Sequence, residues 1–211
     1  WPRCGGSLIW MLNDCWPATS WSLIDFDGRK KAAYYYAKRA FAPTLVSFAP
    51  LGEGLELWLT NNSRMAVSDE LVLRRLTFDG VIRWETKVAV DSAPATSAAV
   101  LTLPDEALAE PTATYLEVRS VGDSVAPNRH LLAPLPQLQR TVAPPSFDWR
   151  TNGREITTTV TATTLCLATH LVVPGPQIDW SDDYFDLAPG ESRTITTSEA
   201  FDAETLTIRC R

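Results

Sequence analysis

The sequence predicts a mainly β chain, in which one strand–helix unit is followed by two antiparallel β-sandwiches. Residues 1–43 combine an unbroken apolar run with a helical pattern of apolar side chains. Residues 44–136 alternate apolar and polar side chains between closely spaced turn signals, which is typical of a sandwich. Residues 147–211 return to short alternating segments after the proline-rich stretch 137–146, which we interpret as a linker.

The composition is that of a globular protein. The chain has 211 residues, of which 45% are hydrophobic and 21% charged. Its net charge of −6, without a basic cluster, argues against a nucleic-acid partner. No apolar run approaches the roughly 20 residues of a membrane span, so no membrane partner is expected. The sequence begins at Trp1, and we expect it to be a piece of a longer protein whose cellular compartment is not predicted.

The strand–helix unit is predicted from two neighbouring segments. Leu8–Leu12 is wholly apolar and is bounded by glycines before it and by Asn13-Asp14 after it, which predicts a parallel strand buried on both faces. Residues 29–41 place apolar side chains at helical spacing, and Pro43 prevents the helix from continuing. A parallel strand needs parallel neighbours, and no later segment supplies one. This unit therefore resembles the last piece of a larger domain.

The first sandwich is predicted from alternation and one strong turn. Leu55, Leu57 and Leu59 share one strand face, and Asp79-Gly80 predicts a tight hairpin between two apolar runs. Residues 104–108 predict one helical turn. Further short strands are expected at residues 114–120 and 128–132.

The second sandwich is predicted from two β-branched runs, at residues 155–162 and 164–173, followed by a turn at 174–176. Leu206, Ile208 and Cys210 form a last alternating strand. If Leu165 and Leu167 face inward, Cys166 lies on the opposite face. The alternatives for it are a cross-link to Cys210 or a free thiol, and the free thiol is favoured.

The chain shows no spacing of a metal site. Its four cysteines and two histidines form no ligand motif, so no metal and no cofactor are expected. One acidic cluster, made of Asp179, Asp182, Asp183 and Asp186, has oxygen ligands that calcium prefers. It has no internal glycine and no EF-hand spacing, which favours a solvated turn.

Residues 5–43, which include Trp10-Met11-Leu12-Asn13-Asp14-Cys15-Trp16-Pro17 and end at Phe41-Ala42-Pro43, closely resemble the end of the catalytic barrel in β-mannosidases of glycoside hydrolase family 2. The segment Trp180-Ser181-Asp182-Asp183-Tyr184 resembles the final immunoglobulin-like domain of that family. The resemblance implies that residues 1–43 are the eighth strand, loop and helix of a (β/α)8 barrel. It also implies that the longer protein releases terminal β-D-mannose from β-mannosides with retention.

The resemblance places the two catalytic glutamates on earlier barrel strands. Residues 1–43 contain no glutamate, and their carboxylates are Asp14, Asp25 and Asp27. We therefore expect no catalytic residue in this chain and no activity from it alone.

The resemblance implies substrate contact by Trp10, with Asn13 and Asp14 as further candidates that turn formation and capping explain equally well.

Packing roles are favoured for four other tryptophans. Trp16 and Trp21 are expected to pack the loop against neighbouring domains. Trp58 and Trp84 are either a sugar-binding face or core residues of the first sandwich, and the core is favoured.

Three alternatives to a β-mannosidase remain open. Two are enzymes of the same family, the exo-β-glucosaminidases and the mannosylglycoprotein endo-β-mannosidases. The third is a β-sandwich module that binds glycans and has no catalytic activity. The expected partners are a β-mannoside oligosaccharide and the rest of the catalytic barrel. Because Leu8–Leu12 lacks its neighbouring strands here, self-association of the chain is also expected.

Overall fold

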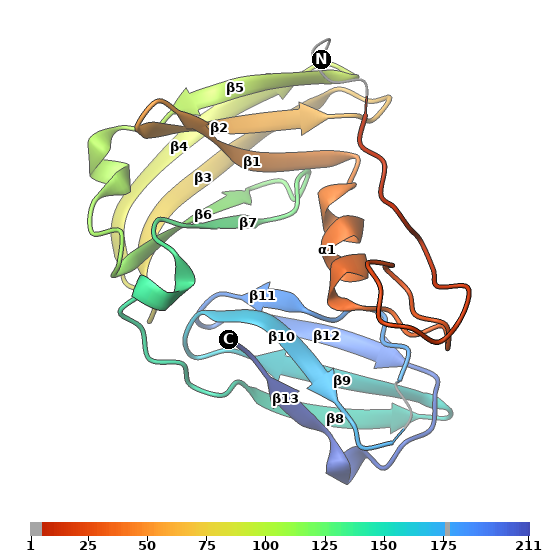
Figure 1. The fold of residues 1–211 in the computed structure, drawn as a ribbon. Helices are drawn as coiled ribbons and strands as arrows, with labels where there is room; N and C mark the ends of the chain where they lie inside the picture. The colour runs from red at the N-terminus through yellow and green to blue at the C-terminus, as the bar shows by residue number, and fades with distance from the viewer. Residues whose placement is uncertain (1–5, 176–177) are drawn as a thin grey trace. The chain divides into compact units, whose positions relative to one another are not determined.

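The computed structural model describes residues 6–175 and 178–211, which divide into two compact units (Figure 1). The first unit comprises residues 42–140, and the second joins residues 6–41 to residues 141–211. Both units are built from antiparallel sheets, which confirms the predicted mainly β fold. None of the described helices has the length and apolar character to cross a membrane. Cys4 and part of the predicted turn at 174–176 lie outside the described residues.

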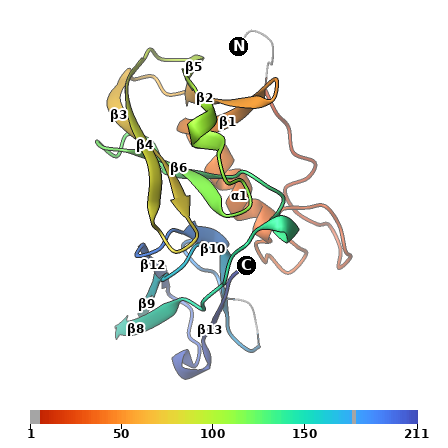
Figure 2. The same cartoon turned by 90° about the vertical axis from the view of Figure 1, so that its left-hand side faces the viewer.

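The first unit is a sandwich of two antiparallel sheets, whose faces are seen in Figures 1 and 2. One sheet has the order β1-β2-β5, and its strands are β1 (Thr44–Leu51), β2 (Gly54–Asn61) and β5 (Thr96–Thr102). The other has the order β4-β3-β6-β7, and its strands are β3 (Val67–Thr77), β4 (Ile82–Ser92), β6 (Thr114–Ser120) and β7 (Asn128–Leu131). A 3₁₀ turn at Asp105–Leu108 confirms the predicted helical turn.

The core of this sandwich lies where the alternating pattern predicts it. Leu57 and Leu59 of β2 are buried against Leu71 and Leu73 of β3. The β3–β4 hairpin turns at the predicted Asp79-Gly80 pair, where Gly80 has a φ of 95° that favours glycine. Local alternation and turn chemistry therefore predicted β2, the β3–β4 hairpin, β6 and β7, whereas β1 and β5 are absent from the predicted strands.

Trp58 and Trp84 of the first unit differ in whether they pack against its core. Trp84 packs against the core, as predicted. Trp58 does not, because it alternates with the buried Leu57 and Leu59 and so lies on the outer face of its sheet. There its indole N–H donates to the Glu56 carboxylate at 3.1 Å. The predicted core position of Trp58 is wrong, since period two places it opposite the leucines.

The second unit contains a smaller sandwich and one helix. One sheet has the order β12-β9-β8, and its strands are β8 (Ser146–Asn152), β9 (Glu155–Thr161) and β12 (Ser192–Thr197). The other has the order β11-β10-β13, and its strands are β10 (Cys166–Val172), β11 (Phe185–Leu187) and β13 (Thr207–Arg209). Strands β8, β11 and β12 are absent from the predicted strands. The side chains of β8 are all exposed, so it carries little apolar alternation.

Cys166 lies in the core of the second unit, which corrects the prediction that it faces away from Leu165. The register of β10 with β11 shifts between Cys166 and Thr169, and Ala168 within this shift has a φ of 49°. Leu165 lies before the first residue of β10, so strand alternation does not apply between it and Cys166, and both are buried. Cys210 is a free thiol, in agreement with the favoured alternative.

Helix α1 (Ala32–Ala40) is shorter than the predicted helix at residues 29–41. The Arg29 N–H donates to the Asp25 carboxylate at 2.8 Å, and the Lys31 N–H donates to the Leu23 carbonyl at 2.9 Å. These bonds engage the backbone before Ala32 in a turn, so the helix begins three residues later. Tyr35 is its only buried side chain among those described.

The predicted strand at Leu8–Leu12 is not formed. Leu8 is fully exposed, and only a single parallel bridge, between Asn13 and Ile24, pairs the backbone nearby. A parallel strand is stabilised by hydrogen bonds to neighbours on both sides, and the described residues supply only residues 23–24. The apolar run is therefore irregular, with bends at Trp10 and Leu12.

Candidate functional site

The residues that carry the predicted site lie in an irregular loop before α1. Three backbone hydrogen bonds hold the two sides of this loop together: Leu23 N–H to Met11 O, Ile24 N–H to Leu12 O, and Asp14 N–H to Ile24 O, at 3.1, 2.9 and 3.0 Å. The peptide bond between Trp10 and Met11 is cis. Residues 11–14 thus lie beside residues 23–24, and Trp10 stands at the start of the paired stretch.

Trp10 presents its indole to solvent, with 77% of its surface exposed. Several other large apolar side chains of the same loop are exposed, and we call this set the apolar loop surface: Leu8, Ile9, Trp10, Leu12, Trp16, Trp21 and Phe26. The predicted packing of Trp16 and Trp21 against a neighbouring domain is not seen within the described residues. The loop instead offers broad apolar faces and few charges.

Asp14 differs from Trp10 in being buried, with 6% of its surface exposed. Its Oδ1 accepts a hydrogen bond from the Ser20 hydroxyl, and its Oδ2 accepts from the Ser22 hydroxyl at 2.8 Å. The Lys31 ammonium lies 3.3 Å from the same Oδ2. The hydroxyls of Ser20 and Ser22, followed by the Lys31 charge, hold the pKa of Asp14 below its usual value.

Lys31 closes this network from the first residue before α1. Its Nζ donates to the Ser22 hydroxyl at 2.7 Å and to the Ser20 carbonyl at 3.2 Å. Asn13, next to Asp14, is exposed and donates from its amide to the Asp14 carbonyl at 3.2 Å. The structure thus brings the three predicted residues together at one end of the loop. Only Trp10 and Asn13 reach solvent, and substrate contact by any of them stays a prediction.

Sequence reasoning missed Ser20, Ser22 and Lys31. Lys31 reads as an exposed residue of an amphipathic helix, and two serines in a loop carry no signal of their own. The available signal was a lone carboxylate, Asp14, directly after an apolar run, because a buried charge requires donors from elsewhere in the chain.

The acidic cluster is neither a solvated turn nor a calcium site in this structure. Asp182 accepts from Arg39 at 3.0 Å and from Arg193 at 2.6 Å, and Asp179 pairs with Lys30 at 2.6 Å. Within residues 6–175 and 178–211, no group of histidine, cysteine and carboxylate side chains is arranged to hold a metal ion. The prediction of a solvated turn is wrong for Asp182, which Arg39 of α1 and Arg193 of β12 bind, and for the buried Asp183, whereas Asp179 stays 58% exposed.

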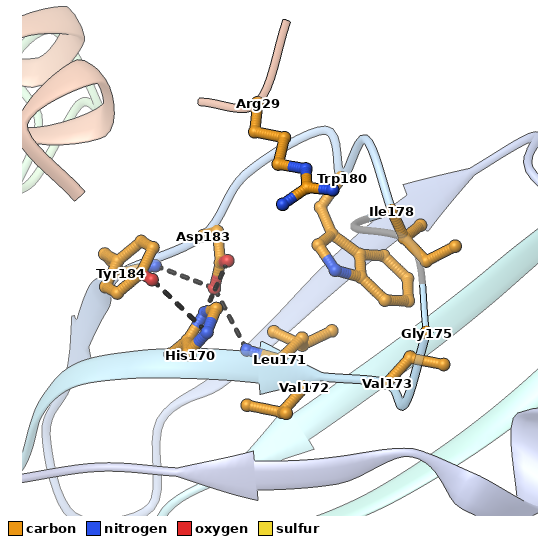
Figure 3. Close-up of a pocket in the computed structure, with 10 residues that line it drawn as sticks. All are labelled: Arg29, His170, Leu171, Val172, Val173, Gly175, Ile178, Trp180, Asp183 and Tyr184. Atoms are coloured by element: carbon orange, nitrogen blue, oxygen red, sulfur yellow. Dashed lines mark hydrogen bonds and ion pairs between the residues drawn. The ribbon is translucent and has the colours of Figure 1, made fainter. Parts of the chain in front are cut away.

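A hollow of about 170 Å³ lies beside this cluster, between Arg29, Trp180 and the end of β10 (Figure 3). Asp183 is buried at its wall and accepts from the Leu171 and Tyr184 N–H groups at 3.0 and 2.9 Å. His170 Nδ1 lies 2.7 Å from the other Asp183 oxygen, and its ring stacks on Tyr184 at 4.2 Å between centroids. Burial and the nearby Asp183 charge raise the pKa of Tyr184. The Asp183 carboxylate is thus bound by groups of its own unit. These bonds order the turn whose backbone accepts a hydrogen bond from Arg39 of α1.

Comparison with protein families matches both sandwiches. Residues 53–135 match the mannosidase Ig/CBM-like domain, and residues 136–209 match the Ig-fold domain of mannosidases. The two matches are adjacent and together cover most of the chain.

Among curated proteins, the chain is similar to enzymes called beta-mannosidase B. It is 32% identical to that of Thermothelomyces thermophilus over 133 residues, which are 55% of this chain and 14% of that protein. It is 34% identical to that of Aspergillus niger over 90 residues, which are 36% of this chain and 11% of that protein. The chain thus spans a small part of the length of these relatives.

Among solved structures, the fold is similar to that of beta-D-mannosidase from Dictyoglomus thermophilum. The TM-score is 0.83 at 22% identity, over 99% of this chain and 26% of that one. The exo-chitosanase CsxA of Amycolatopsis orientalis has a TM-score of 0.66 at 19% identity, over 89% of this chain and 27% of that one. At these identities the likeness concerns the fold alone.

Proposed function

We propose that the longer protein containing this chain, which belongs to glycoside hydrolase family 2 and carries two mannosidase domains, releases terminal β-D-mannose from β-mannosides. The observation that carries the proposal is the pair of adjacent mannosidase domains at residues 53–135 and 136–209. Relatives named beta-mannosidase B, 32–34% identical over 90–133 residues, support the same activity.

The chemistry of the proposed reaction belongs to parts of the protein beyond this chain. A retaining glycosidase needs two carboxyl groups about 5–5.5 Å apart, one as acid/base and one as nucleophile. Asp14 is the buried carboxylate of the loop, and its oxygens are engaged by Ser20, Ser22 and Lys31. The proposal therefore assigns no catalytic residue to this chain. We expect the purified chain to release no nitrophenol from a nitrophenyl β-mannoside.

The proposed contribution of this chain is a substrate contact. An indole offers an apolar face that suits the C–H face of a sugar, together with one N–H donor. Trp10 is exposed enough to take this role, and the Asn13 amide stands three residues along the same loop. We propose that these side chains line the mannose subsite, while the rest of the barrel covers other parts of the apolar loop surface.

The test uses the full-length protein with nitrophenyl β-mannoside and nitrophenyl β-glucosaminide. Trp10→Ala should lower kcat/KM for the mannoside at least tenfold, or roughly 1.4 kcal/mol of transition-state binding. The matched control is Trp149→Ala, which removes a half-exposed tryptophan of β8 and should leave kcat/KM unchanged. An unchanged rate constant with a lowered melting temperature in Trp10→Ala would assign Trp10 to packing instead.

A glucosaminidase of the same family is the second candidate function, because the sequence left that alternative open. The two substrates distinguish the candidates, since the preferred sugar gives the larger kcat/KM. A protein that binds mannoside oligosaccharides but hydrolyses neither substrate would support the non-catalytic glycan-binding alternative.

A further inference from the structure

We propose that Asp14 is a positioning residue, which orders the loop that presents Trp10 and Asn13 and does not itself bind the sugar. This inference rests on the proposed function, because it concerns how the proposed substrate contact is held. It differs from the expectation that Asp14 is a direct contact.

The hydrogen-bond capacity of Asp14 is directed inward. Its carboxylate is buried and accepts from two hydroxyls, those of Ser20 and Ser22, while the Lys31 ammonium supplies the opposite charge. A buried carboxylate that gave up these donors to a sugar hydroxyl would have to leave its pocket, at the cost of breaking charge-assisted hydrogen bonds. Trp10 and Asn13, by contrast, are already exposed.

The network joins three separate points of the loop. Asp14 follows the stretch that carries Trp10, Ser20 and Ser22 lie on the returning side, and Lys31 is the residue from which α1 begins. Lys31 Nζ reaches back to the Ser20 carbonyl and the Ser22 hydroxyl, so the ammonium contacts both serines as well as the carboxylate. A loop that lacks a regular sheet is thus tied at its centre to the start of a helix.

That helix is itself held firmly within the second unit. Arg39 near its end binds Asp182 and the Tyr184 carbonyl, and Lys30 before its start binds Asp179. Asp14 is therefore connected, through Lys31, to a helix attached to the folded sandwich at both ends. Removing Asp14 should release the loop while leaving this attachment in place.

The expected consequence is a misplaced Trp10. A displacement of about 1 Å in a positioning group is enough to cost on the order of 100-fold in rate. If Asp14 acts through Trp10, the two residues form one functional pair. Their substitutions should then be strongly non-additive, whereas two independent substrate contacts should give additive effects.

The experiment is a double-mutant cycle in the full-length protein, with kcat and KM measured separately for nitrophenyl β-mannoside. The variants are Trp10→Ala, Asp14→Ala, the double variant, and the milder Ser22→Ala and Asp14→Asn. We expect Asp14→Ala to lower kcat/KM about tenfold or more alone, and by less than about twofold when Trp10 is already alanine. Asp14→Asn keeps one acceptor oxygen and should recover part of the loss. Asp27→Ala, which removes an exposed aspartate from the same loop, is the control for loss of a carboxylate.

Each outcome of the cycle is informative. Additive losses from Trp10→Ala and Asp14→Ala would overturn the positioning role in favour of direct contact by Asp14. A large loss in Trp10→Ala with wild-type rates in Asp14→Ala and Ser22→Ala would overturn positioning but leave the proposed function intact. Wild-type rates in Trp10→Ala would overturn the proposed substrate contact and this inference with it. If Asp14→Ala fails to fold, the same comparison is made with Ser22→Ala and Asp14→Asn.

Discussion

The guanidinium of Arg39 lies 3.0 Å from the carboxylate of Asp182, a residue 143 positions further along the chain. The same guanidinium donates to the backbone carbonyls of Asp183 and Tyr184, at 3.3 and 2.5 Å. The other Asp182 oxygen accepts from Arg193 at 2.6 Å. One arginine of α1 therefore organises the acidic turn of the last sandwich, and this contact explains why residues 6–41 and 141–211 form one unit.

Arg39→Ala should destabilise the second unit by about 1–2 kcal/mol, because it removes one ion pair and two charge-assisted bonds from a partly exposed site. Arg39→Lys keeps the charge but not the planar fork and should recover only part of the loss. The buried Trp180 reports on this unit in a denaturant titration followed by fluorescence. Arg154→Ala, at an exposed position of the same unit, is the control. Equal losses of stability in Arg39→Ala and Arg154→Ala would contradict the role of Arg39.

Glu117→Ala should destabilise the first unit by about 3–5 kcal/mol, the usual cost of removing one partner from a buried ion pair. The buried Glu117 carboxylate accepts from Arg119 at 2.7 Å and from Arg129, whose side chain is 8% exposed, at 2.9 Å. The midpoint of urea unfolding, monitored by circular dichroism, measures the change. Glu53→Ala removes an exposed glutamate of the same unit and should shift the midpoint little. A similar shift in both variants would refute the prediction.

Acid should destabilise the first unit partly through Asp69. The hydroxyls of Ser120 and Ser124, followed by backbone N–H groups, hold the pKa of Asp69 well below its usual value of about 3.9. A carboxyl group whose pKa is lower in the folded state stabilises the fold above its unfolded pKa. That stability is lost as pH falls through about 3.9 towards the folded value.

The Asp69→Asn variant tests this sign. It should be less stable than the natural chain at pH 7, and the difference should shrink between about pH 4 and pH 2. Urea titrations at several pH values measure the difference. Asp105→Asn, at an exposed aspartate of the same unit, serves as the control. A difference that stays constant or grows towards low pH would contradict the assignment.

The chain alone should self-associate through the apolar loop surface. Leu8 is fully exposed and Trp16 and Trp21 are 70% and 72% exposed, so the loop leaves a large apolar area in water. Size-exclusion chromatography with light scattering should show species larger than the 23.3 kDa monomer. Trp16→Ser together with Trp21→Ser should shift these towards monomer, whereas Met65→Ser, at an exposed position of the first unit, should not. A monomer at all concentrations would show the prediction wrong.

Elements that depend on local pattern were predictable from the sequence. Leu57 and Leu59 are buried because strand side chains alternate, and Gly80 turns the hairpin because it tolerates a positive φ. The tryptophan and loop sequence of residues 10–43 also carried the family resemblance. In each case the determining information lies within a few adjacent residues.

Other features depended on residues distant in the chain. The burial of both Leu165 and Cys166 depends on where β10 begins, and the absence of a strand at Leu8–Leu12 depends on the lack of neighbouring strands among the described residues. Neither condition is written in the local sequence. Period two and apolar runs predict a strand, but its bulges and its partners are properties of the assembled sheet.

The sequence by itself determined the mainly β fold, the two sandwiches and the helix that precedes them, because hydrophobic periodicity and turn residues act locally. Only the tertiary structure decided the roles of the charged residues. The buried Asp14 is bound by Ser20, Ser22 and Lys31, and the acidic turn is bound to α1 by the ion pair between Arg39 and Asp182. A carboxylate looks the same in a sequence whether it is solvated or paired. Which of the two applies is set by the donors that folding brings within about 3 Å of it.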